Sequence, residues 1–162
     1  MYGFFVVAYG MNKNTVIFDL DGTLADITAR KELATKPNGK LDWDKFFDPS
    51  NIKLDVPNKP VVKLAQMLAE DGFTINIFSG RTDKTMHTTR SWLSQHRIPF
   101  QKLIMRDSKI NHFTPDDILK KDMLDKYVDI NDVFLVVDDR NKVVDMWRSL
   151  GLTVFQVADG NF

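Results

Sequence analysis

Cysteine is absent from this chain of 162 residues. Its absence excludes disulfides, thiolate catalysis and cysteine-ligated zinc. The chain also lacks a surplus of charge of either sign, because lysine and arginine together number 22 and so do aspartate and glutamate. A strong non-specific nucleic-acid binder carries a basic surplus, so this class is not expected, although a local basic surface is still allowed.

Long hydrophobic runs are missing as well. No apolar segment approaches the ~18 residues that a membrane-spanning helix needs. The segment from Met1 to Gly10 is apolar and uncharged, but it lacks the basic start and the length of a secretory signal. Residues 1–13 are therefore interpreted as a leader or as an extra strand. The absence of cysteine and of a signal favours a cytoplasmic setting.

The length and the overall composition, with 43% hydrophobic and 27% charged residues, are typical of one globular domain. Apolar runs that end in polar residues predict strands at 15–20, 73–78, 103–105, 133–137 and 153–157. Apolar residues at helical spacing lie between several of these runs. Pro60 opens one predicted helix, and Thr114 caps another that begins at Pro115. The alternation predicts an α/β fold, a Rossmann-like three-layer sandwich around a mostly parallel five-stranded sheet.

A polar, irregular stretch interrupts this alternation around residues 26–57. It contains turn signals and one short amphipathic piece at 41–47. We interpret it as a minimal cap insert within a domain that spans 14–162.

Chemically capable side chains follow four of the predicted strands. In parallel sheets, ligands bind beyond the carboxyl ends of the strands, so these residues are expected at one edge. They are Asp19, Asp21, Ser79, Arg81, Arg106, Asp138 and Asp139. Carboxylates two positions apart at a strand exit can share one divalent cation. Gly22 allows the backbone a sharp turn beside them.

The segment Phe18-Asp19-Leu20-Asp21-Gly22-Thr23-Leu24 resembles the first motif of the haloacid dehalogenase superfamily, whose members are mostly magnesium-dependent phosphatases. Ser79, Lys120 and the pair Asp138-Asp139 resemble the second, third and fourth motifs, in family order. Residues 136–148 and 155–162 are similar to the phosphatase domain of phage polynucleotide kinase/phosphatase, and so are 79–81, 89–92 and 116–120.

The resemblance implies a two-step phosphoryl transfer. Asp19 would be the nucleophile, and Asp21 would be the general acid and then the general base. The acid role predicts a raised pKa for Asp21. Mg²⁺ would bind to Asp19, to the main-chain carbonyl of Asp21 and to one carboxylate of the last pair. Asp139 is the expected direct ligand, with Asp138 behind it, because neighbouring side chains on a strand point to opposite faces.

The resemblance also implies which residues bind the phosphate. Ser79, nearby main-chain N–H groups and Lys120 would hold the phosphoryl oxygens. Further substrate-binding positions are Gly22, Thr23, Arg30, Gly80, Arg81, Arg106, Asp116 and Arg140. Alternatives stay open: Lys121 competes with Lys120, the arginines could be surface charges, and Asp116 could only complement a helix dipole. The tryptophans are interpreted as core or cap packing rather than as base-stacking platforms.

The resemblance implies a 3′-phosphorylated end of DNA or RNA as the substrate, and the small cap agrees with this because it leaves the site open to a polymer. Residues 81–109 carry seven basic and two acidic side chains, a local charge of +5 that favours a nucleic-acid strand. The alternatives are a phosphatase of nucleotides or other small esters, and a non-catalytic phosphate-sensing module. No phosphate-loop string is present, so any kinase activity would come from a separate kinase or ligase partner. If the chain is phage-encoded, its setting is the host cytoplasm.

Overall fold

The computed structural model describes residues 13–161. The predicted leader therefore lies outside the described residues, except for Lys13. A sheet of five parallel strands forms the centre, in the order β5-β4-β1-β6-β7. The strands are β1 (Thr15–Asp19), β4 (Thr74–Thr82), β5 (Lys102–Arg106), β6 (Val133–Asp138) and β7 (Val154–Gln156). This architecture confirms the predicted fold class. Within the described range, no helix is long and apolar enough to cross a bilayer.

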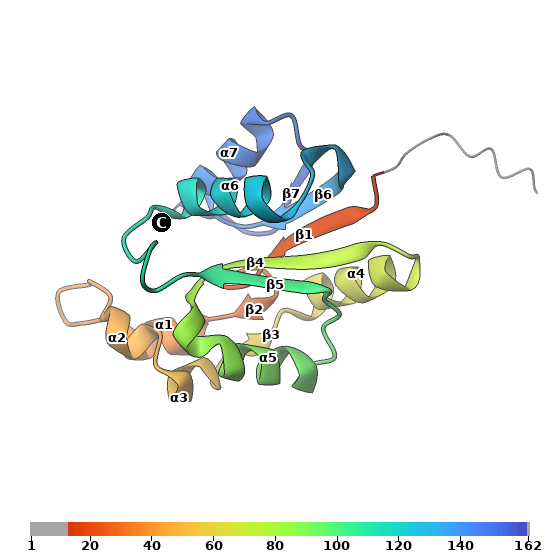
Figure 1. The fold of residues 1–162 in the computed structure, drawn as a ribbon. Helices are drawn as coiled ribbons and strands as arrows, with labels where there is room; N and C mark the ends of the chain where they lie inside the picture. Colours follow the sequence, from red (N-terminus) through yellow and green to blue (C-terminus); the bar gives the residue numbers. More distant parts are fainter. Residues whose placement is uncertain (1–12, 162) are drawn as a thin grey trace, which may run out of the picture.

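Helices cover both faces of the sheet and make the three layers visible in Figure 1. One face carries α4 (Lys59–Glu70) and α5 (Met86–Gln95); the other carries α6 (Asp116–Tyr127) and α7 (Asn141–Ser149). A separate apolar cluster fills the space on each side, and both clusters contain buried residues of β1, β4 and β6. The strands are apolar on both faces for this reason, as expected of a parallel sheet between helices.

The alternation along β1 decides where its last residue points. Val16 and Phe18 belong to the apolar cluster that includes α4 and α5, whereas Ile17 belongs to the cluster that includes α6 and α7. Successive side chains of a strand point to opposite faces. Asp19 therefore lies on the same side as Ile17, toward α6, at the carboxyl end of the central strand.

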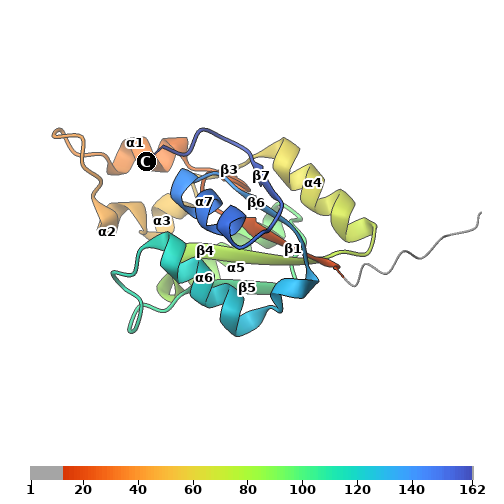
Figure 2. The ribbon, with the colours of Figure 1, turned by 90° about the horizontal axis from the view of Figure 1, so that it is seen from above.

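The region expected to be an irregular cap contains more regular structure than the sequence suggests. It consists of β2 (Ala25–Asp26), α1 (Thr28–Ala34), α2 (Trp43–Phe46), α3 (Pro49–Ile52) and β3 (Val56–Pro57). Strands β2 and β3 pair antiparallel, and the helices lie beside the carboxyl ends of the large sheet (Figure 2). Helix α1 has no apolar stripe because its buried residues are Arg30 and Ala34, so hydrophobic periodicity could not reveal it.

Two boundaries differ from the prediction. Strand β4 continues to Thr82, beyond the predicted end at residue 78, and its register with β5 shifts between Ser79 and Thr82. Such a bulge re-aims side chains at the end of a strand. Pro115, not Thr114, occupies the N-cap position of α6, without a side-chain capping bond.

Candidate active site

Three buried carboxylates meet where β1 and β6 end. Asp19, Asp138 and Asp139 each offer one oxygen, and these oxygens lie within 4.8 Å of one another. The position of Asp19 follows from the orientation of β1. Asp138 and Asp139 lie at the end of the neighbouring strand β6. Hard oxygen donors at this spacing fit a divalent cation. The group is therefore the candidate metal site of the described residues.

Lys120 supplies the positive charge inside this acidic group. Its ammonium lies 2.6 Å from Oδ1 of Asp19 and 2.8 Å from Oδ2 of Asp138, and its side chain is 4% exposed. Burial acts to lower the pKa of Lys120, but the carboxylates of Asp138 and Asp19 raise it by more than burial lowers it. The pKa of Lys120 is therefore raised, and the side chain is charged. Lys121 instead pairs with Asp125 on the exposed face of α6. Lys120 is thus the lysine that faces the site.

Charge is unbalanced in this group, since three carboxylates surround one ammonium. Burial raises the pKa of Asp19 well above its usual range, and the neighbouring Asp138 and Asp139 raise it further, whereas Lys120 lowers it. Burial and Asp138 likewise raise the pKa of Asp139. A bound cation would relieve this repulsion.

Asp21 differs from the expectation of a raised pKa. Its burial acts in that direction, but the guanidinium groups of Arg81 and Arg30 outweigh it and lower the pKa of Asp21. Oδ1 of Asp21 accepts from Nε of Arg81 at 2.9 Å and from Nη2 of Arg30 at 2.7 Å. The neighbouring carboxylates alone would raise the pKa of Asp21, and the spacing of residues along the chain does not indicate that two arginines bind it.

Arg30 and Arg81 are both fully buried, and they hold carboxylates rather than facing open space. Besides Asp21, both arginines bind Asp55, at 2.9 Å and 2.7 Å. Burial raises the pKa of Asp55 to about 6. This cluster of two arginines and two aspartates fixes the position of Asp21. Asp55 was missed because it lies in the cap region, outside any motif.

A second ion-pair group contains three more residues expected to bind substrate. Asp116 accepts from Nη2 of Arg106 at 2.5 Å and also pairs with Arg140. Every nitrogen of Arg106 has a partner, because its other donors bind the carbonyls of Gly80, Asn111 and Thr114. Arg106 therefore anchors the loop between β5 and α6, and the guanidinium of Arg140 pairs with the same aspartate.

The remaining predicted residues support the backbone around the carboxylates. Ser79 is buried, and its hydroxyl accepts from the main-chain N–H of Arg81 at 3.1 Å. The hydroxyl of Thr23 donates to Oδ2 of Asp19 at 3.0 Å. Gly80 lines the open side of the site. The structure thus brings the predicted residues to one edge of the sheet, in distinct contact groups.

Gly22 is needed here for space as well as for conformation. Its φ is +85°, and a Cβ built on it would lie 2.2 Å from Oδ2 of Asp139.

Gly39 is a matched control for a substitution at Gly22, because it has a similar φ of +77° and no atom near the position of its own Cβ. We expect Gly39→Ala to cost ~1 kcal/mol of unfolding free energy through backbone strain. Gly22→Ala should cost ~1–3 kcal/mol more through overpacking. Urea denaturation measures both, and equal losses would contradict the close approach to Asp139.

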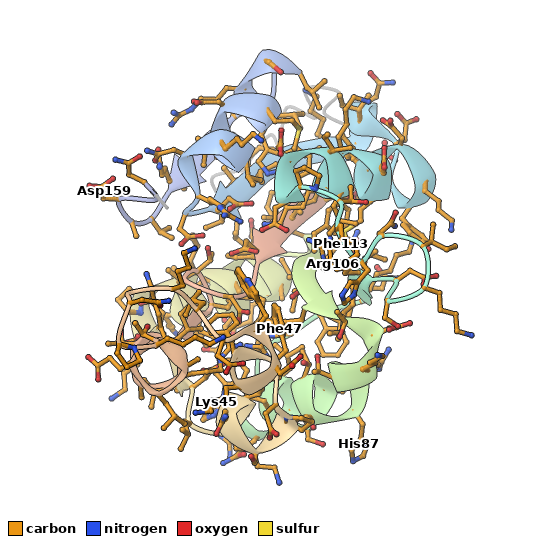
Figure 3. All side chains as sticks on the ribbon, turned by 90° about the vertical axis from the view of Figure 1, so that its left-hand side faces the viewer. Lys45, Phe47, His87, Arg106, Phe113 and Asp159 are labelled. Atoms are coloured by element: carbon orange, nitrogen blue, oxygen red, sulfur yellow. The ribbon has the colours of Figure 1, made fainter. Side chains whose placement is uncertain are left out.

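A cavity of 780 Å³ opens from the acidic group toward solvent. Asp19, Lys120 and Asp139 lie at its inner end, and residues of the cap and of the loop after β5 form its walls. Figure 3 looks toward the carboxyl ends of the strands, with Phe47 on the cap side and Phe113 and Arg106 on the other. The site is therefore accessible through an open mouth.

One expectation about the surroundings of the site needs correction. The seven basic residues between 81 and 109 do not form one patch at the cavity: Lys84 and Arg106 line it, whereas Arg81 is fully buried. Lys102 begins β5, so it lies at the opposite end of that strand, where its ammonium donates to the carbonyl of Tyr127. Trp92 and Trp147 are buried in the core, whereas Trp43 packs against Phe46 and Phe47 of the cap and is 58% exposed at the cavity.

Solved structures resemble this fold. A chain of the Pnkp1/Rnl/Hen1 complex is 33% identical, with a TM-score of 0.76 over 92% of this chain and 47% of that one. A structure of the Pnkp1/Rnl/Hen1 RNA repair complex gives the same identity and TM-score over 91% and 43%. A putative phosphatase from Clostridium difficile shares the fold at 16% identity, with a TM-score of 0.65 over 91% and 86%.

The present chain spans less than half the length of the two chains from these complexes. A family model gives the more specific result: that of the polynucleotide kinase PNKP phosphatase domain matches residues 13–162. The match includes all the carboxylates and basic residues described above. The chain therefore belongs to the family of polynucleotide kinase PNKP phosphatase domains, within the haloacid dehalogenase-type phosphatases.

Proposed function

We propose that this phosphatase removes the 3′-phosphate from DNA or RNA ends, with Mg²⁺ as its cofactor and an aspartyl-phosphate on Asp19 as its intermediate. The observation that carries the proposal is the placement of Asp19. It lies at the inner end of an open cavity, in contact with Lys120 and within a carboxylate group of metal-binding spacing.

In the first step, a carboxylate oxygen of Asp19 attacks phosphorus in line with the ester oxygen. The new O–P bond forms as the bond to the sugar oxygen breaks. Lys120 and Thr23 hold the two oxygens of Asp19, so the nucleophile approaches in one orientation. In this proposal, Lys120 also stabilises negative charge on the phosphoryl oxygens.

Asp21 supplies the proton in this proposal. The two arginines keep its carboxyl ionised in the free protein, as its lowered pKa indicates. A phosphate dianion bound beside it raises its pKa, since a like charge disfavours the ionised form. Asp21 then takes up a proton as substrate binds and gives it to the departing sugar oxygen. In the second step it accepts a proton from the water that hydrolyses the aspartyl-phosphate.

The donor set fits Mg²⁺, which prefers carboxylate and carbonyl oxygens. When bound, the ion would neutralise phosphate charge next to Asp19. Asp139 is the better candidate for direct contact, because it lines the cavity. Asp138 has its Oδ2 occupied by Lys120 and Trp147 and its Oδ1 by the main-chain N–H of Asp139. This supports Asp138 as the residue behind the ligand.

A panel of phosphate esters tests the proposal. With Mg²⁺ present, we expect a 3′-phosphorylated oligonucleotide to be hydrolysed with a higher kcat/KM than its 5′-phosphorylated counterpart or a mononucleotide. Chelation of the metal should abolish release of phosphate. A preference for the mononucleotide would overturn the polynucleotide assignment in favour of a small-molecule phosphatase. Full activity after chelation would overturn the metal requirement.

Partners are proposed on the same basis. The related chains belong to structures of a Pnkp1/Rnl/Hen1 complex, one of them named an RNA repair complex. A separate kinase or ligase acting with this chain on nucleic-acid ends agrees with the class of substrate proposed here.

A further inference from the structure

We propose that two aromatic walls of the cavity grip the nucleobase of the nucleotide that carries the phosphate. Trp43 and Phe47 of the cap form one wall, and Phe113 of the loop between β5 and α6 forms the other. This inference rests on the proposed function, because a nucleic-acid end supplies the base.

The cap wall is a built platform. The rings of Trp43 and Phe47 stack with centroids 5.9 Å apart and planes 17° apart, and the edge of Phe46 packs against Trp43 at 5.8 Å. Arg30 lies 4.3 Å above the ring of Phe46 and donates to its carbonyl. Arg30 also binds Asp21, so Phe46 and Arg30 connect the platform to the catalytic centre.

The opposite wall exposes a large apolar side chain on an anchored loop. Phe113 is 92% exposed, and it lines the cavity. The carbonyls of Asn111 and Thr114, on either side of it, both accept from Nη1 of Arg106 at 2.6 Å. Phe113 lines the same cavity as the cap platform, so together they give the cavity an apolar surface of the kind that marks a binding site.

The charges of the cavity favour a base over a length of phosphodiester backbone. Arg106 and Arg140 pair with Asp116, and Lys142 lies 3.2 Å from Asp117. Six basic and seven acidic side chains line the cavity, so its lining has no surplus of positive charge to attract further phosphates. Stacking on aromatic rings accepts any base and suits an enzyme that acts on many ends. A volume of 780 Å³ suits one nucleotide, with its phosphate at Asp19 and its base at the mouth.

Two oligonucleotides test the inference, identical except that one lacks the base on its 3′-phosphorylated nucleotide. The wild-type protein should act on the complete end with a KM about tenfold or more lower than on the base-free end. In the double variant Trp43→Ala with Phe113→Ala, this ratio should fall to about one. Trp43→Phe should keep most of the preference. Phe155→Ala is the matched control, because Phe155 is 52% exposed on β7, away from the cavity walls.

Tryptophan fluorescence gives a second readout, since Trp43 is exposed and the other two tryptophans are buried. Adding the complete oligonucleotide to the inactive Asp19→Asn protein should quench the emission, and Trp43→Phe should remove the quenching. If wild type hydrolyses both oligonucleotides with equal KM, or if the double variant keeps the preference, the inference fails and the proposed function stands. If the wild-type protein hydrolyses neither oligonucleotide but does hydrolyse small phosphate esters, both the proposed function and this inference are wrong.

Discussion

Asp19→Asn is expected to lower the rate of phosphate release by at least ~10⁴-fold, the scale of loss when a covalent nucleophile is removed. Asparagine keeps the shape of the side chain and can still accept a hydrogen bond from Lys120. It cannot form an aspartyl-phosphate under the same conditions. Single-turnover release of phosphate from a 3′-phosphorylated oligonucleotide measures the effect.

The same substitution should leave the fold intact and stabilise the metal-free protein at neutral pH. The pKa of Asp19 is raised in the folded protein, mainly by burial. A carboxyl with a raised folded pKa holds its proton more tightly when folded, so stability is lost as pH rises from the unfolded pKa through the folded one. Asparagine removes that loss. Circular dichroism and urea denaturation with a chelator present are the controls. An active variant would argue for a non-covalent mechanism or a different nucleophile.

Lys120→Met is expected to lower the free energy of unfolding by ~3–5 kcal/mol at neutral pH, because it leaves two buried carboxylates without their cation. Those carboxylates belong to Asp19 and Asp138, at 2.6 and 2.8 Å from the ammonium. Lys121→Met is the matched control, since Lys121 pairs with Asp125 at the surface. It should cost only ~0.3–0.5 kcal/mol.

The pH dependence of Lys120→Met separates lost charge from lost packing. As pH falls, the unpaired carboxylates take up protons, and the loss of stability should shrink. Urea denaturation at about pH 5 and about pH 7.5 measures the difference for both variants. Equal losses in the two variants, or a loss independent of pH, would contradict the buried ion pair.

The parallel sheet and the meeting of its strand ends could be predicted from the sequence, because buried strands are apolar throughout and end in polar residues. The alternation of side chains along β1 then leads directly to the contact between Asp19 and Lys120. Of the two lysines that competed for the third motif, only Lys120 faces the carboxylates.

The partners of the arginines could not be predicted. Each arginine has several donors on a long side chain, and spacing along the chain does not say which carboxylate they reach. Arg30 lies on a helix without an apolar stripe, and its partner Asp55 comes directly before β3 of the cap. The lowered pKa of Asp21 follows from these long-range contacts. The exposure of Trp43 likewise depends on how the cap packs as a whole.

Trapping the phosphorylated enzyme tests the central claim most directly. The protein is mixed with Mg²⁺ and a 3′-phosphorylated oligonucleotide, quenched in acid during turnover, digested and analysed by mass spectrometry. We predict a phosphoryl group on the peptide that contains Asp19, absent from Asp19→Asn and from samples without substrate. Turnover at full rate with that peptide unmodified at every quench time, or a phosphoryl group on another residue, would contradict the account.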